Sequence, residues 1–426
     1  MRTGNRFKNK IISLKGKLKE LKIYSLSRSC DFQKRKAKKI TSLNLILSFY
    51  NCNLLGNFSL SGWAFQLGQL INKPVSKQAI FDRLDGDFTK LCRELLDKSF
   101  SSKFSTKKLL NRFSNVYIQD STCIHLPTSL FKFYQGNNSF TGNHSVAKVQ
   151  VIYNLVKNTF EELTLSSFTR NDQAASADIL KYVRAGDLIV RDLGYFVINS
   201  LKEIINRKAH FICPLRKDIK LFHQSKNQLI DLKKLLKNKK YLKQNVLLGK
   251  EQRLPVTLIA VKLGENETRY RQKCALHDRD KRKKMTAEKM YLLGWDIFIC
   301  SCHELEPQTI QDIYRIRWQI EIIFKSWKSH LKLEQSIPQR LVRPFIPEAI
   351  IYLTLLLTIL FIMPLYRWAL KITKEISLIK LTRFVALLMP QNNWIINQAQ
   401  LINNIRLIIY EVRNRDSFAN KLSLLT

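Results

Sequence analysis

Tyr314, Arg317, Glu321 and Lys328 stand at short, fixed spacings within one stretch of the sequence. On an α-helix, with about 100° per residue, all of them lie within an arc of roughly 60°. One carboxylate flanked by two cations and a phenol suits an anionic substrate held near a metal ion. The plainer interpretation is a solvated helix face with an Arg317–Glu321 ion pair, which contributes only tenths of a kcal/mol.

An apolar face runs beside this polar stripe. Its residues recur at spacings of three and four: Ile313, Ile316, Ile320, Ile323, Phe324 and Trp327. Such a pattern predicts one continuous helix across residues 314–328. The helix is expected to pack through its apolar face and to present the polar stripe beside it.

The spacing Tyr-(2)-Arg-(3)-Glu-(6)-Lys resembles the signature of the cut-and-paste DDE transposases of insertion sequence family 4. In that family the Glu is the third of three metal-binding carboxylates. Asp120, in Asp-Ser-Thr, and Asp192, in Asp-Leu-Gly-Tyr, resemble the first two motifs. The resemblance implies a DNA transposase of an insertion sequence, which cleaves phosphodiester bonds at the element ends and transfers a strand into target DNA. Asp120, Asp192 and Glu321 are then the catalytic residues and the ligands of two Mg²⁺ ions, with Mn²⁺ as an alternative.

Each aspartate also has a structural interpretation. Asp120 could cap the turn into Ser121 and Thr122, and Asp192 could begin the turn at Gly194. Leu193 departs from the pattern, because many members of the family have Arg there. This departure concerns a DNA contact and leaves the metal ligand unchanged.

The segments that must position the two aspartates have the sequence pattern of an α/β fold. Strand patterns occupy residues 115–120, 145–156, 160–168, 187–192 and 210–215. Helices are predicted over residues 171–185, with Asn171 as the cap, and over residues 196–206. Three adjacent strands followed by alternating helix and strand indicate a ribonuclease H-like core. Asp120 and Asp192 are therefore expected as neighbours at strand ends.

The interval between Asp192 and Glu321 is long for a bare core of this kind. Residues 217–250 are predicted as loop with some helix, while residues 255–263 and 295–302 are strand-like. The resemblance implies a β-rich insertion here. The expected division is a helical DNA-binding region (1–110), a first part of the core (111–216), the β-rich insertion (217–303), the Glu helix that completes the core (304–340) and a helical C-terminal region (341–426). Residues 395–412 of this last region are apolar at helical spacing and are a candidate dimer surface.

A second DNA-binding element is predicted near the N-terminus. A short helix from Gly62, a break at Asn72-Lys-Pro74 and a second helix capped by Ser76 have the layout of a helix-turn-helix. Its second helix offers Lys77, Gln78 and Arg83 to a DNA groove.

Further DNA contacts are implied only by the resemblance. Tyr314, Arg317, Lys325 and Lys328 correspond to residues that hold phosphates around the scissile bond. Arg216 corresponds to another phosphate contact. Trp295 corresponds to an aromatic residue on which a displaced base stacks, and its structural alternative is a tryptophan of the core.

The charge balance points to a polyanionic partner. Lys and Arg outnumber Asp and Glu by 72 to 33, a net charge of +39. The expected partner is double-stranded DNA, both the terminal inverted repeats and the target, bound by a homodimer with strong salt dependence. Eight cysteines without repeated spacing, and no secretory signal, favour reduced thiols in the bacterial cytoplasm, at the nucleoid. Cys300, Cys302 and His303 lack a usual zinc spacing.

Two other classes of protein remain open from the sequence. One is a basic DNA-binding protein without catalysis, encoded by a decayed copy of the element. The other is a membrane-associated protein, because residues 349–365 form an apolar run of about seventeen residues, at the lower limit for crossing a bilayer. Thr354, Thr358 and Pro364 interrupt this run. A buried helix explains it more simply, and no membrane is expected.

Overall fold

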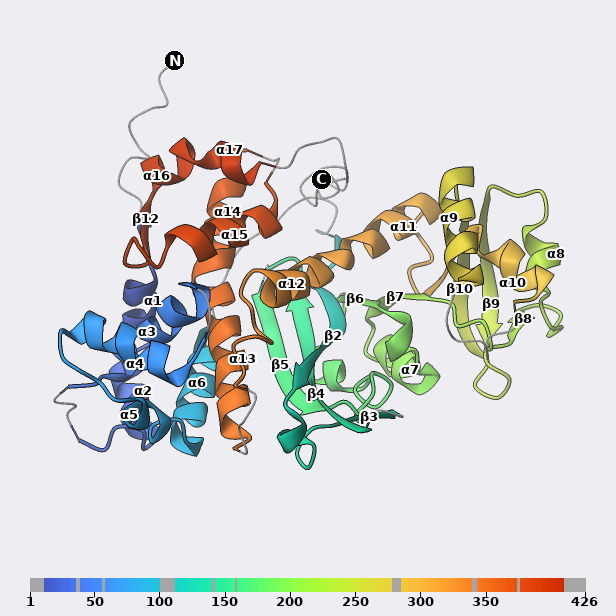
Figure 1. Cartoon of the computed structure of the whole chain (residues 1–426). Helices are drawn as coiled ribbons and strands as arrows, with labels where there is room; N and C mark the ends of the chain where they lie inside the picture. The colour runs from blue at the N-terminus through green and yellow to red at the C-terminus, as the bar shows by residue number, and fades with distance from the viewer. Residues whose placement is uncertain are drawn as a thin grey trace, which may run out of the picture.

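The computed structural model describes residues 11–35, 39–55, 58–99, 112–139, 142–157, 159–277, 285–338, 343–373 and 376–409. At its centre lies a large mixed sheet of ten strands with helices around it, so the protein is of the mixed α/β type. Helices from both ends of the chain form a second body beside this sheet (Figure 1).

The part of the sheet that carries the two aspartates has six strands. They are β2 (Val116–Leu126), β3 (Gln135–Ser139), β4 (Gly142–Asn154), β5 (Thr159–Ser167), β6 (Leu188–Arg191) and β7 (His210–Pro214). The central strand β2 pairs antiparallel with β4, which in turn pairs antiparallel with β5 and β3. On its other side β2 pairs parallel with β6, and β6 pairs parallel with β7. The predicted strands of this region are confirmed.

The position of Asp120 within β2 differs from the prediction. The strand was expected to end at Asp120, but it continues for six more residues to Leu126. The extension pairs with β4 alone, because β6 stops at Arg191, opposite Gln119. Asp120 and Asp192 therefore follow paired residues of two neighbouring parallel strands, and they are adjacent at the point where β6 ends.

Residues 217–303 do not form a separate sheet. Their strands are β8 (Leu221–His223), β9 (Tyr241–Leu248), β10 (Leu254–Lys262) and β11 (Trp295–Cys300). They pair antiparallel in the order β11-β10-β9-β8, and β11 pairs with β7, so the central sheet continues through them. The prediction of loop with some helix for residues 217–250 was wrong in part, because this segment contains β8 and β9. Its helices, and those that follow, are α8 (Leu232–Leu236), α9 (Glu265–Leu276) and α10 (Ala287–Leu292).

Two helix predictions in the core need correction. Residues 171–185 form turns and one 3₁₀ turn, Asp178–Lys181, although the Asn171 side chain does accept a hydrogen bond from the Ala174 N–H. The polar side chains of this segment bond to neighbouring strands instead of supporting a helix. The following helix, α7 (Ile198–Asn206), is close to its predicted range.

The helix predicted across residues 314–328 is divided at Arg317. Helix α11 spans Pro307–Ile316 and α12 spans Trp318–Ser329. At the junction the Arg317 N–H donates to the Tyr314 carbonyl and the Ile320 N–H donates to the Arg317 carbonyl, so the bonds span three residues instead of four. The apolar face is buried as predicted, and α12 contacts β2 (Figure 1).

The N-terminal and C-terminal regions pack together. The N-terminal helices are α1 (Leu14–Glu20), α2 (Ile23–Ser29), α3 (Ser42–Leu55), α4 (Leu60–Ile71), α5 (Lys77–Phe81) and α6 (Gly86–Ser99). The C-terminal helices are α13 (Phe345–Leu357), α14 (Met363–Leu370), α15 (Leu378–Leu388), α16 (Gln398–Asn403) and α17 (Ile405–Ile408). Strand β1 (Ile11–Ser13) pairs with β12 (Ile395–Asn397), and the Tyr50 hydroxyl donates to the Leu353 carbonyl at 2.8 Å. The single apolar helix expected after Ile395 is therefore a short strand followed by two short helices; residues 410–412 lie outside the described part.

The apolar run at residues 349–365 belongs to a helix within this body. Helix α13, a π-helical turn at Thr358–Ile362 and α14 together span Phe345–Leu370, the one stretch of the described residues long and apolar enough to cross a membrane. Pro364 lacks an N–H group and cannot continue the regular ladder, which accounts for the irregular turn before it. Of its most apolar window, 89% is buried inside the protein, against α6 among others.

Trp327 connects the Glu helix to this apolar helix. Its side chain is 1% exposed, and its indole N–H donates to the Thr358 hydroxyl at 3.0 Å. We expect Trp327→Phe to lower the free energy of unfolding by about 1–2 kcal/mol, since it removes one buried hydrogen bond and some packing. Chemical denaturation measures this loss. Trp318→Phe is the matched control, because Trp318 is 57% exposed and its replacement should change stability by less than about 0.5 kcal/mol. Equal losses of unfolding free energy in the two variants would contradict the stabilising role of the Trp327–Thr358 contact.

Candidate active site

Asp120, Asp192 and Glu321 converge on one guanidinium group, that of Arg317. One terminal nitrogen of Arg317 is hydrogen-bonded to Asp120 Oδ2. The other lies 2.7 Å from Glu321 Oε1 and 3.8 Å from Asp192 Oδ1. Three acidic side chains that are widely separated in the sequence therefore meet around a single cation.

Each carboxylate is positioned by a different element. Asp120 lies on β2, and its Oδ1 accepts a hydrogen bond from the Ser121 N–H at 2.8 Å. Asp192 follows the last residue of β6. Glu321 stands in the first turn of α12, where the helix dipole favours a negative charge. The apolar face of α12 fixes the helix against the sheet, and this packing directs Glu321 toward the aspartates.

The carboxylates open onto a cleft of about 470 Å³. Its lining residues are Asp120, Ser121, Thr122, Asp192, Arg317, Glu321, Phe324, Lys325, Lys328 and Ser329. Lys325 is exposed and Lys328 is half-buried, so both predicted cations stand at the cleft. We call the carboxylates of Asp120, Asp192 and Glu321 the acidic floor of the cleft, and Lys325 and Lys328 of α12 its basic wall.

Burial acts on the pKa values of Asp120 and Arg317. It raises the pKa of Asp120 to about 6, although Arg317 and the Ser121 N–H act in the opposite direction. For Arg317, burial acts to lower the pKa, but Tyr314 and the three carboxylates outweigh it and the net shift is upward. Arg317 therefore stays charged and compensates the acidic groups.

The donor set suits a hard divalent cation, because carboxylate oxygens converge from three elements. The described residues contain no cluster of three or more His, Cys, Asp or Glu side chains already arranged around a common point. In this structure the Arg317 guanidinium lies among the three carboxylates and is the cation that compensates them. Its Nε is buried without a hydrogen-bond partner. The oxygen atoms of Asp120, Asp192 and Glu321 are the donors that such a cation prefers.

Tyr314 and Arg317 were expected to contact phosphates. In this structure both contact carboxylates, and the Tyr314 hydroxyl donates to Asp192 Oδ1 at 3.3 Å. The residues of the polar stripe thus differ in their contacts. Tyr314 and Arg317 bond to carboxylates, whereas Lys325 and Lys328 line the cleft.

Arg216 and Trp295 lie elsewhere. Arg216 follows β7 and pairs with Asp218, with its Nε 2.7 Å from Asp218 Oδ1. Trp295 begins β11, where it pairs with Lys262 of β10. Its side chain is 4% exposed and packs among buried apolar residues of the core. This burial agrees with the structural interpretation of Trp295, since a base can stack only on an accessible ring face.

The predicted helix-turn-helix residues lie at the far side of the helical body. The second helix was predicted over residues 75–84, but α5 spans only Lys77–Phe81. The Ser76 hydroxyl caps it, as predicted, by accepting a hydrogen bond from the Ala79 N–H at 3.1 Å. Lys77 and Gln78 are exposed. The Arg83 guanidinium bonds back to the Ala79 carbonyl and lines a cavity of about 960 Å³ together with Arg35. Helix α5, which carries Lys77 and Gln78, lies far from α12, which carries Glu321 (Figure 1).

The sequence interpretation missed one residue that lines the cleft and one that lies behind it. Ser329 lines the cleft and lies eight residues after Glu321, so helical spacing alone could have placed it on the same face. Asp172, behind Ser121, had no periodic signal because it lies in an irregular loop.

Comparisons with known proteins identify the family of the chain. Residues 111–338, more than half of the chain, match the family model described as "Transposase DDE domain". The chain is 27% identical over 343 residues to the transposase for insertion sequence element IS231B of Bacillus thuringiensis subsp. berliner, covering 74% of this chain and 72% of that protein. It is 26% identical over 343 residues to the transposase for IS1151 of Clostridium perfringens, with the same coverage.

A solved structure is also similar, the piggyBac transposase synaptic complex with hairpin DNA. It has a TM-score of 0.46 and 10% sequence identity, and the alignment covers 94% of this chain and 85% of that chain. The family match includes Asp120, Asp192 and Glu321, the residues that meet at Arg317. The chain therefore belongs to the family of transposases that carry a DDE domain.

Proposed function

We propose that this chain is the transposase of a bacterial insertion sequence, which cleaves DNA at the ends of its element and joins those ends to a target. The observation that carries the proposal is the convergence of Asp120, Asp192 and Glu321 on one cleft whose wall holds Lys325 and Lys328. The strand order is β5-β4-β2-β6-β7, in which β4 runs antiparallel to the other four strands. This order supports a ribonuclease H-like core for this chemistry.

The three carboxylates are the groups that would hold the metal, proposed as two Mg²⁺ ions with Mn²⁺ as a substitute. When bound, such ions activate a hydroxyl nucleophile and stabilise the leaving oxygen at phosphorus. The protein's own residues supply the rest. Lys325 and Lys328 bind phosphates beside the scissile bond, and Arg317 joins them when it leaves the carboxylates. The Tyr314 hydroxyl fixes the orientation of Asp192.

The remaining parts of the chain are proposed to bind and arrange the DNA. Helix α5 presents Lys77 and Gln78, with Arg83 beside them, to the terminal repeats, and the net charge of +39 makes that binding weaken steeply with salt. Residues 217–303 are proposed as a β-rich insertion. The C-terminal region, residues 341–426, is proposed to supply a dimer surface for the DNA complex. The site of action is the bacterial cytoplasm, at the nucleoid.

The pKa of Asp120 gives this function a pH dependence. A carboxylate must lose its proton before it can ligate a metal, and burial raises the pKa of Asp120 from 3.8 to about 6. The cleavage rate at limiting Mg²⁺ should therefore rise with pH through a midpoint near 6 and level off above it. Below the midpoint the rate should fall about tenfold for each pH unit. A single-turnover profile from pH 5 to 8 measures this, with DNA binding followed in parallel. A rate that is flat down to pH 5 would contradict it.

The test of the function uses the purified protein with DNA that carries the ends of the element. With Mg²⁺ we expect nicks at the element ends and their joining to target DNA, and with EDTA we expect binding alone. The second candidate, a decayed copy that only occupies its ends, is favoured by the basic surface of α5. Binding of the ends with no nicking in Mg²⁺ or Mn²⁺ would establish that candidate instead.

A further inference from the structure

Asp172 lies in the loop between β5 and the 3₁₀ turn and receives several hydrogen bonds on one oxygen. Its Oδ1 accepts from the Ser121 hydroxyl at 2.8 Å and from the Gln150 side-chain amide at 3.1 Å. The Lys148 ammonium lies 2.7 Å from the same atom. Ser121 belongs to β2, whereas Lys148 and Gln150 belong to β4. One carboxylate thus ties the loop to both strands.

This carboxylate is held in its charged form. The Lys148 side chain is 7% exposed and that of Asp172 is 25% exposed, so the ion pair is largely shielded from water. Burial acts to raise the pKa of Asp172, but the hydrogen bonds from Lys148 and Ser121 outweigh it and the net shift is downward. A charged acceptor forms stronger hydrogen bonds than a neutral one, which keeps the Ser121 hydroxyl fixed.

Ser121 links this network to Asp120. Its hydroxyl donates to Asp172, while its backbone N–H donates to Asp120 Oδ1 at 2.8 Å. The orientation of the Ser121 side chain therefore fixes the residue whose N–H holds the Asp120 carboxylate.

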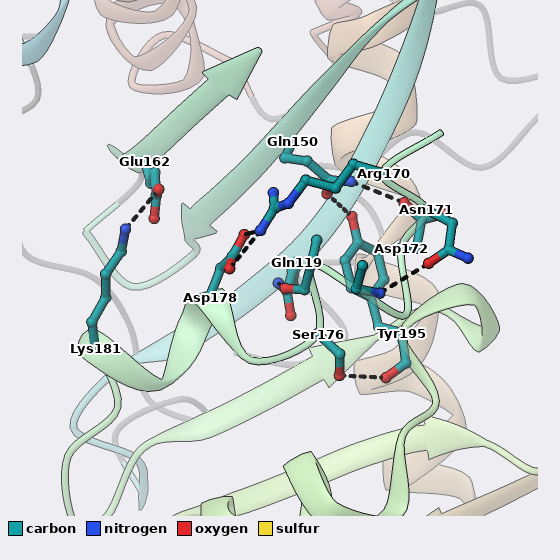
Figure 2. A network of polar contacts seen from close by, with 12 residues as sticks. Gln119, Gln150, Glu162, Arg170, Asn171, Asp172, Ser176, Asp178, Lys181 and Tyr195 are labelled. Atoms are coloured by element: carbon teal, nitrogen blue, oxygen red, sulfur yellow. Dashed lines mark hydrogen bonds and ion pairs between the residues drawn. The ribbon is translucent and has the colours of Figure 1, made fainter. Parts of the chain in front are cut away.

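The same aspartate contacts the turn that follows Asp192. A Cβ atom placed on Gly194 would lie 2.9 Å from Asp172 Oδ2, closer than real Cβ atoms approach other atoms. A larger residue at position 194 would require the Asp172 side chain to shift from the position in which Ser121, Gln150 and Lys148 hold it. One residue later the Tyr195 hydroxyl is hydrogen-bonded to the Gln150 side chain, which itself donates to Asp172; Figure 2 shows Gln150 between the two. The turn after Asp192 is therefore packed against Asp172.

We propose that Asp172 is a positioning residue that fixes the relative placement of Asp120 and Asp192 by holding Ser121 on one side and the Gly194 turn on the other. The inference depends on the proposed role of the two aspartates as metal ligands. It explains the residue types that follow them, a hydroxyl after Asp120 and a glycine two positions after Asp192. Residues that orient metal ligands from behind typically change metal affinity or activity 10–100-fold when they are replaced.

The test compares variants of the full-length chain in single-turnover cleavage of element-end DNA across a Mg²⁺ titration. Asp172→Ala is expected to cleave about 10–100-fold more slowly and to need more Mg²⁺ for half-maximal rate, while DNA binding stays within about twofold. Asp172→Asn keeps an acceptor oxygen and should recover part of the rate. Asp178→Asn is the matched control. It breaks the ion pair with Arg170 in the same loop but has no bond to Ser121, Gln150 or Lys148 in the described structure, so its rate and Mg²⁺ dependence should stay near wild type (Figure 2).

The Ser121→Ala variant tests whether a folding defect explains the loss in Asp172→Ala. It leaves the Lys148–Asp172 ion pair intact and keeps the N–H that holds Asp120. We expect its rate to fall about fivefold, as for loss of one hydrogen bond, and the Ser121→Ala/Asp172→Ala double variant to be no slower than Asp172→Ala. Wild-type rate and Mg²⁺ dependence in Asp172→Ala, with Glu321→Gln inactive, would overturn this inference and leave the three carboxylates in place. A loss that follows only the folded fraction, without a change in Mg²⁺ dependence, would also overturn it. Activity in Glu321→Gln would instead refute the proposed ligands themselves.

Discussion

Replacement of Glu321 by glutamine is expected to reduce cleavage of element-end DNA by more than about 100-fold, with DNA binding unchanged within about twofold. The amide keeps the size of the side chain but cannot carry the negative charge that a divalent ion requires. Glu321 is half exposed and faces the cleft, so the exchange leaves the packing of α12 intact. The same loss is expected for Asp120→Asn and Asp192→Asn.

Single-turnover cleavage in Mg²⁺ and an electrophoretic binding assay measure the two quantities separately. Glu306→Gln is the matched control, since it removes the same charge next to α11 at a position that is 74% exposed and pairs only with Lys243 in the described structure. It should cleave at the wild-type rate. A Glu321→Gln protein that still cleaves would remove Glu321 from the catalytic set, whatever the other two variants do.

Much of this site follows from local patterns in the sequence. The apolar face shared by α11 and α12 was predictable because helical periodicity depends only on neighbouring residues, and all six predicted positions are buried. The hairpin of β4 and β5 was readable for the same reason. The adjacency of Asp120 and Asp192 was also predictable, because each follows a strand and the two strands were expected to be neighbours. In the structure β2 and β6 are parallel, and Gln119 pairs with Arg191, so the aspartates that follow them are adjacent.

The features that could not be predicted depend on contacts between distant residues. The helix divides at Arg317, whose side chain bonds to Asp120, 197 positions away. The pattern of Trp295 fits either an accessible or a buried ring, and packing between β10, β11 and their neighbours decides for burial. Residues 171–177 have the composition of a helix start, but their polar groups find partners on β2 and β4, and these bonds replace the helical ones.

The position of Arg317 leads to a second large expected effect, on stability. One guanidinium compensates three carboxylates, two of them partly exposed. Without it, the acidic groups face one another across the space that it leaves. Arg317→Ala should therefore lower the free energy of unfolding of the metal-free protein by roughly 2–3 kcal/mol, less than for a fully buried ion pair because water screens Asp192 and Glu321.

The sign of the metal effect separates this explanation from a simple loss of packing. A divalent cation can replace the missing positive charge, so millimolar Mg²⁺ should raise the thermal unfolding temperature of Arg317→Ala more than that of the wild type, in which the cation must first displace the guanidinium. Thermal unfolding in EDTA and in Mg²⁺ measures both quantities without reference to activity. Arg315→Ala, which removes a charge two residues earlier from an exposed pair with Asp312, should behave like wild type in both conditions. If Mg²⁺ stabilises Arg317→Ala no more than the wild type, Arg317 does not stand in for a bound cation, and its contact with the carboxylates is ordinary ion pairing.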